Sequence, residues 1–100
     1  MIKHSKELLV IIAEATLEKM LIDDVKKLGA HGYNITEVRG SGDSGDRDGI
    51  WEADRTIRME VICETRVAEE IAGQVMEKYS DHYGLSLYFS KVEVLRPQKY

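Results

Sequence analysis

The chain has 100 residues, the length of one domain. Its 18 acidic residues outnumber its 14 basic ones, and the net charge of −4 disfavours a nucleic-acid duplex or an anionic membrane surface as partner. The single cysteine excludes an intrachain disulfide. No apolar run approaches the roughly 20 residues of a membrane span, and the charged start of the chain is unlike a secretory signal. We therefore expect a cytoplasmic protein.

The first part of the chain predicts a strand, a helix and a second strand. Residues 8–13 are a continuous apolar run, typical of a strand buried on both faces in the middle of a sheet. Thr16 can cap a helix that ends at Gly29. The apolar stripe of this helix is expected to hold Leu17, Met20, Leu21, Val25 and Leu28. A strand over residues 32–39 follows.

The second half repeats this order of elements. Apolar residues alternate along residues 56–63, which predicts a strand with one buried face, on which Cys63 is interpreted as a small buried hydrophobe. Thr65 can cap a second helix that ends near Gly84. Its apolar stripe is expected to hold Val67, Ile71, Val75, Met76 and Tyr79. A final strand begins at Leu85, and a change of apolar phase at residues 90–91 predicts a bulge.

The order β-α-β-β-α-β predicts an α+β, ferredoxin-like fold. We expect an antiparallel sheet with two helices on one face, as a single domain over residues 1–100. This fold hosts many functions, so the order of elements does not define an activity.

The connection between the two middle strands, about residues 40–55, is unusually long and polar. Hairpin loops normally hold roughly 2–5 residues, and structureless loops beyond about 12–15 are usually functional or disordered. We therefore expect a flexible loop that carries the function. Gly40-Ser41-Gly42 could let backbone N–H groups approach a phosphate, with a simple hinge as the alternative. Trp51, beside Ile50, is predicted either to contact a partner protein or to fold back onto the protein itself.

Metal binding and catalysis have little support in the sequence. The acidic loop suggests a calcium site, but the position of the bidentate glutamate in an EF-hand falls on Arg55 and no helices flank the loop. The three histidines have no metal-ligand spacing. No nucleophile–base arrangement is visible, so we expect no catalytic residue, no required cofactor and no enzyme activity. Slow nucleotide hydrolysis is the remaining enzymatic alternative.

Residues 32–42, Gly-Tyr-Asn-Ile-Thr-Glu-Val-Arg-Gly-Ser-Gly, resemble the second-strand signature of the PII signalling family. Residues 57–66, 83–85 and 92–97 are similar to the PII-like branch that includes the regulator of the bicarbonate transporter and the carboxysome-associated protein. The long connection then coincides with the T-loop of that family.

This resemblance implies a homotrimer with sheets facing inward and an adenine nucleotide (ADP, AMP or ATP) in each cleft between subunits. It also implies bicarbonate as a candidate second ligand. The T-loop would change order with the ligand and signal to a target protein, a transporter or a carbon-metabolism enzyme, in inorganic carbon supply.

The resemblance also implies positions for the ligand. Gly40, Ser41 and Gly42 would cradle phosphate, with Arg47 and Arg96 as nearby positive charges. The remaining lining residues would be Gly32, Tyr33, Asn34, Glu60 and Ile62 from one subunit and Gly84 and Leu85 from its neighbour, with Tyr83 at the helix end as a further candidate.

One departure from the family pattern affects the expected ligand. Asp43 stands where the family usually has a basic residue. An acidic loop with few cations should repel additional phosphate charge, so we expect AMP or ADP to be favoured over ATP. The alternative to a nucleotide sensor is a ferredoxin-like trimeric adaptor or a metal-tolerance-type protein that binds no nucleotide.

Overall fold

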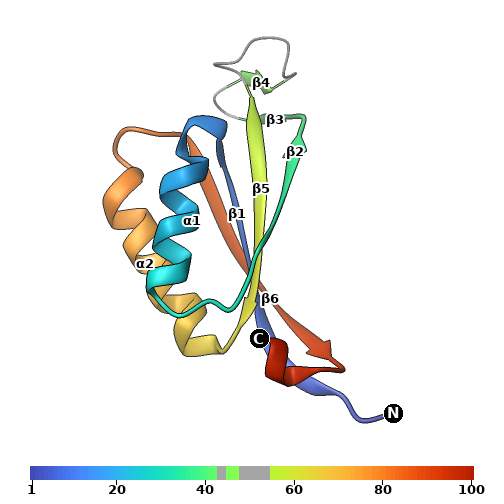
Figure 1. The fold of residues 1–100 in the computed structure, drawn as a ribbon. Helices are drawn as coiled ribbons and strands as arrows, with labels where there is room; N and C mark the ends of the chain where they lie inside the picture. The colour runs from blue at the N-terminus through green and yellow to red at the C-terminus, as the bar shows by residue number, and fades with distance from the viewer. Residues whose placement is uncertain (43–44, 48–54) are drawn as a thin grey trace.

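The computed structural model describes residues 1–42, 45–47 and 55–100 (Figure 1). An antiparallel sheet of four strands carries two helices on one face, which confirms the predicted α+β, ferredoxin-like fold. The strands are β1 (His4–Glu14), β2 (Asn34–Val38), β5 (Thr56–Cys63) and β6 (Leu85–Val94). The helices are α1 (Glu18–Lys27) and α2 (Thr65–Tyr79), and the one-turn helices η1 (Ala15–Leu17) and η3 (Pro97–Lys99) follow β1 and β6.

The strand order β2-β5-β1-β6 places β1 inside the sheet and leaves β2 and β6 as its edges. As the continuous apolar run predicts, β1 is buried on both faces, with Leu9, Val10 and Ile11 all at 0% exposure. Side chains of alternate residues point to opposite faces of a strand. We call the sheet face away from the helices the open face.

The pairing of β1 with β6 is regular, so the predicted bulge at residues 90–91 is wrong. The register runs without interruption from His4↔Val94 to Ala13↔Leu85. The alternation of apolar residues shifts by one position along β6 because the two ends of this strand bury opposite faces. Leu85 and Leu87 pack against the helix-side core, whereas Val94 is buried on the open face. Between them Lys91, on the helix side, pairs with the buried Glu7 at 2.9 Å.

Most of the predicted core is confirmed, including Leu17, Leu21 and Val25 of the first apolar stripe. Met20 and Met76 are exceptions, because 44% and 46% of their surfaces are exposed. Both lie at the margin of their helical stripes, where a long side chain can turn toward solvent.

The predicted helix starts are also wrong. Thr16 falls within η1, and α1 begins at Glu18 without a side-chain cap; α2 begins at Thr65 itself, preceded by Glu64. Gly29 has φ 106°, which confirms the left-handed stop after α1. Among the described residues, no helix is long and apolar enough to cross a membrane.

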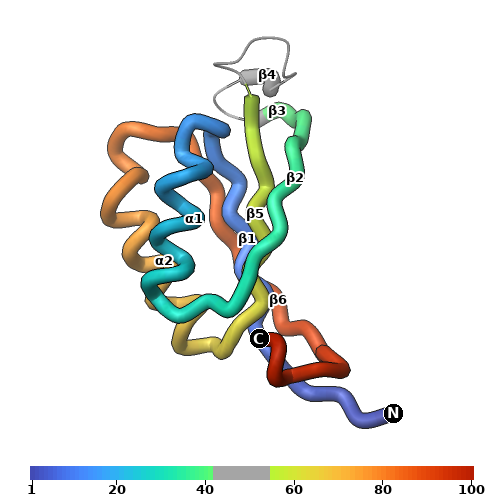
Figure 2. Tube along the Cα trace, viewed as in Figure 1, coloured from blue at the N-terminus to red at the C-terminus, as the bar shows by residue number. Residues whose placement is uncertain are grey.

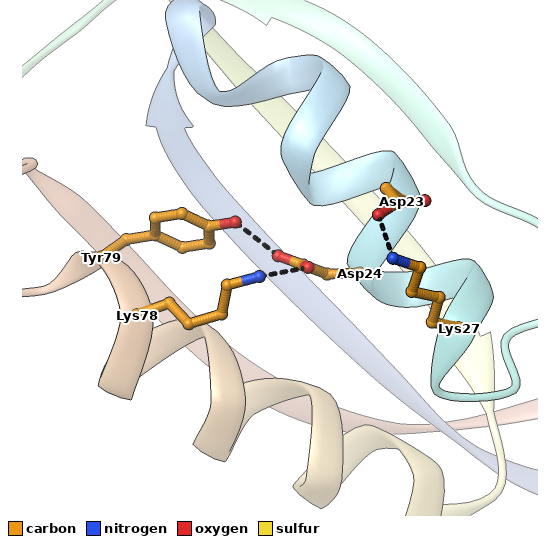
Figure 3. Close-up of polar contacts among 5 residues, drawn as sticks. All are labelled: Asp23, Asp24, Lys27, Lys78 and Tyr79. Atoms are coloured by element: carbon orange, nitrogen blue, oxygen red, sulfur yellow. Dashed lines mark hydrogen bonds and ion pairs between the residues drawn. The ribbon is translucent and has the colours of Figure 1, made fainter.

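A buried carboxylate joins the two helices (Figure 3). Asp24 of α1 is only 4% exposed. It accepts a hydrogen bond from the Tyr79 hydroxyl at 2.6 Å and pairs with the Lys78 ammonium at 2.6 Å. Burial and this hydrogen bond raise the pKa of Tyr79, and the bond to Asp24 raises the pKa of Lys78. Asp24 thus adds a polar side chain to a core for which the sequence pattern predicts only apolar residues.

We expect Asp24→Ala to lower the free energy of unfolding by about 2–4 kcal/mol, because it leaves the buried Tyr79 hydroxyl without its acceptor. Asp23→Ala is the matched control, since Asp23 pairs with Lys27 at the surface and should cost less than about 0.5 kcal/mol. Urea denaturation of both variants measures the difference. Equal losses would show that Asp24 does not stabilise the helix pair.

Candidate functional site

Two connections lie at the same end of the sheet (Figure 1). The long connection leaves β2 at Val38 and returns at Thr56, which faces Val38 in the register. The turn between α2 and β6 ends at Leu85, which faces Ala13 near the end of β1. Gly40, a predicted phosphate-binding residue, and Gly84, predicted to line the site from the neighbouring subunit, therefore lie at the same end of the sheet.

The start of the long connection is not structureless, contrary to expectation. β3 (Gly40–Gly42) and β4 (Gly45–Arg47) form a small antiparallel pair in which Gly40 faces Arg47. Two predicted site residues from different parts of the connection are thus neighbours. The predicted partner-contact residues, Trp51 and Ile50, and the acidic Asp43 lie outside the described residues.

The turn before β6 is held by backbone hydrogen bonds and by one carboxylate. The N–H groups of His82 and Tyr83 donate to the Tyr79 carbonyl at 3.2 and 3.0 Å. The N–H of Gly84 donates instead to Oε2 of Glu14 at 3.0 Å. The Tyr83 ring meets the Tyr79 ring edge-on at 6.1 Å and packs against the core, so it supports the turn.

Other predicted lining residues divide between the two sheet faces. Asn34 faces Glu60 in the register, and Glu60 shares the open face with Ile62. Glu60 is paired with Arg58 of the same strand, with nitrogen–oxygen distances of 2.9 and 3.1 Å.

Tyr33, next to Gly32, packs against the helix-side core, with the Lys26 ammonium 6.0 Å from its ring. The structure therefore brings Asn34, Glu60 and Ile62 together on the open face and turns Tyr33 to the helix side.

Within one chain several of the predicted ligand-lining residues are far apart. Gly40 and Gly84 adjoin the opposite edge strands, β2 and β6, so three strand spacings or about 14 Å separate them. Figure 2 shows both termini at the end of the molecule opposite β3 and β4, and Arg96 follows β6 at this distant end. The 10 residues of β6 span roughly 33 Å. A single chain does not assemble the predicted site.

Two other predictions concern reactive groups. Cys63 is buried at 1% exposure, as expected. Burial first, and then the charges of Glu64 and Glu7, raise the pKa of its thiol to about 11, which disfavours the nucleophilic thiolate. In the part of the chain that the structure describes, no three His, Cys, Asp or Glu residues gather in a way that could hold a metal ion.

The raised thiol pKa predicts a specific pH dependence. Folding favours the neutral thiol, so this stabilisation is present below the ordinary pKa of 9.0 and is lost as pH rises through about 11. Relative to Cys63→Ala, the natural chain should lose about 2 kcal/mol of unfolding free energy between those pH values. Denaturation at several pH values measures this loss. Parallel pH profiles would contradict it.

Comparison with known proteins places these features in a family. The family model described as nitrogen regulatory protein P-II matches residues 6–99. A solved structure from Thermus thermophilus, described as a PII-like signaling protein, is 41% identical, with TM-score 0.86 over 100% of this chain and 99% of its own. The chain therefore belongs to the P-II family.

CPII from Thiomonas intermedia shares the fold at lower identity. Its structure bound to ADP and bicarbonate is 19% identical, with TM-score 0.86 over 98% of this chain and 96% of its own. A second CPII structure, bound to ADP, AMP and bicarbonate, is 17% identical, with TM-score 0.80 over 95% of this chain and 100% of its own.

Proposed function

We propose that this protein is a trimeric regulator that binds an adenine nucleotide in clefts between subunits and signals through residues 40–55. AMP or ADP is favoured over ATP, and bicarbonate is an additional ligand. The target is a transporter or enzyme of inorganic carbon metabolism, contacted through Trp51 and Ile50. In this proposal the protein is not an enzyme and needs no cofactor.

The observation that carries the proposal is the separation of Gly40 from Gly84. They adjoin the opposite edges of the sheet at the same end. A head-to-tail contact that sets the β2 edge of one subunit near the β6 edge of the next brings these residues into one cleft. A head-to-tail contact whose rotation closes produces a ring, which agrees with the trimer implied by the resemblance.

The open face of the sheet supports assembly. Its central strand β1 carries Leu8, Val10 and Ile12; Val10 is already buried within one chain, whereas Leu8 and Ile12 are partly exposed. Tyr88, which faces Val10 across the strand pair, is 42% exposed. Neither α1 nor α2 covers this face (Figure 1). An uncovered apolar sheet face of this kind favours burial against other copies of the chain.

The ligand assignment draws on membership of the family and on charge. CPII, which has the same fold, is bound to ADP and bicarbonate in its solved structure. The acidic residues of the long connection raise the cost of each added phosphate, which supports the preference for AMP or ADP.

Gly84→Ala should weaken ADP binding by about three- to tenfold without loss of stability, because a methyl group hinders close approach of phosphate to the backbone. An added Cβ meets nothing within 4 Å at this position, so the fold should accept it. Gly73→Ala, equally free of contacts on α2, is the control and should leave affinity unchanged. Calorimetry with AMP, ADP and ATP measures the affinities.

The same titration distinguishes the alternative function. Because a ligand that binds only the folded state raises its stability by mass action, ADP should also raise the unfolding temperature of the natural chain. Failure of AMP, ADP and ATP to bind would favour the nucleotide-free adaptor.

Tyr88→Lys should dissociate the trimer, because it places a charge on the open face. Phe89→Lys is a matched control, since Phe89 is adjacent, similarly exposed at 47%, and points to the helix side. Light scattering after size-exclusion chromatography gives the number of chains. A trimer that survives Tyr88→Lys would contradict an inward-facing sheet.

A further inference from the structure

Glu14, which no sequence motif marks, lies between the two connections of the proposed site. It is the last residue of β1 and faces Thr56, the first residue of β5. The N–H of the next residue, Ala15, donates to the carbonyl of Arg55 at 3.0 Å, where the long connection ends. The Glu14 side chain reaches the other way, to the turn before β6.

The Glu14 carboxylate accepts a hydrogen bond from one backbone N–H group of that turn. Oε2 accepts the Gly84 N–H at 3.0 Å, while the neighbouring His82 and Tyr83 N–H groups donate to a backbone carbonyl. A carboxylate and a phosphate are both anions that bind backbone N–H groups strongly. A ligand phosphate that approaches Gly84 therefore competes with Glu14 for the same donor.

Among the residues that the structure describes, no cation neutralises the charge of Glu14. No ion pair between described residues includes Glu14. Arg58, which faces Ile12 on the open face, pairs with Glu60 at 2.9 Å, and Arg55, next to Thr56, pairs with Glu37. Glu14 is also half-buried, and partly buried charges are screened by salt less than exposed ones. Its negative charge therefore acts on any anion bound at this end of the sheet.

We propose that Glu14 sets the charge preference of the nucleotide site, both by competing for the Gly84 N–H and by repelling added phosphate. The inference rests on the proposed nucleotide binding and assigns its phosphate discrimination to one residue. The penalty grows with phosphate number, so Glu14 disfavours ATP most and AMP least. Adenosine, which carries no phosphate, is not affected.

Glu14→Gln is the sharpest test, because the amide oxygen can still accept the Gly84 hydrogen bond while the charge is removed. Glu14→Ala removes both the charge and the hydrogen bond. Glu77→Gln is the matched control, since it removes one negative charge from an exposed position on α2. Calorimetric titration of each variant with adenosine, AMP, ADP and ATP gives four affinities per protein.

We expect Glu14→Gln to strengthen ATP binding by about three- to tenfold, with a smaller gain for ADP, a still smaller one for AMP and none for adenosine. Glu14→Ala should give at least the same gain for ATP, because the donor is also released. Glu77→Gln should leave the ratio of ATP to AMP affinity unchanged.

The outcomes separate the two proposals. If the natural chain binds nucleotide but Glu14→Gln leaves the ATP-to-AMP ratio as in the control, the role of Glu14 is overturned and the proposed function stands. Weaker binding of all four ligands by Glu14→Gln also overturns it, because Glu14 would then support the site. If the natural chain binds no adenine nucleotide, both proposals fail.

Discussion

The position of β1 in the middle of the sheet determines how the other three strands and their connections are arranged. Its pairing with β5 on one side and β6 on the other fixes the register of both. The outer strands β2 and β6 then carry the two connections that reach the same end of the sheet. Because two strands lie between them, the glycines of these connections are held apart by the width of the sheet. The geometry of the proposed cleft is thus a consequence of strand order.

Electrostatics adds a second constraint at the same end of the sheet. The chain carries a net charge of −4, yet the proposed ligand is an anion. In the proposed site, favourable contacts come from backbone N–H groups and from cations, for which Arg47 is a proposed candidate. In our proposal Glu14 opposes them from the end of β1. A site that combines donors with a competing carboxylate discriminates by ligand charge, since each added phosphate gains hydrogen bonds but also meets more repulsion.

The sequence pattern predicts those parts of the fold that depend on local periodicity. The continuous apolar run of residues 8–13 predicts the central strand, and Gly29 predicts the end of the first helix. The pattern wrongly predicts that Met20 is buried, because helical periodicity does not distinguish a residue at the margin of an apolar stripe from one at its centre. Asp24 was missed because its burial depends on Tyr79 and Lys78, which are distant in sequence. Periodicity also suggested a bulge in β6, where the structure instead changes which face is buried.

The candidate site is also less predictable, because its contacts join residues that are distant in sequence. Glu14 meets Gly84 only because β1 and β6 are paired, and no local pattern marks that contact. The family resemblance supplies a set of positions, but it does not say which of them one chain brings together. Asn34 and Glu60 meet within a subunit, whereas one chain leaves Gly40 and Gly84 at opposite edges of the sheet. If a ligand contacts both glycines, its binding free energy also stabilises the contact between subunits, and by reciprocity assembly strengthens binding. A domain of this size buries limited surface on its own, so this linkage would make the proposed ligand a structural component of the trimer as well as its signal.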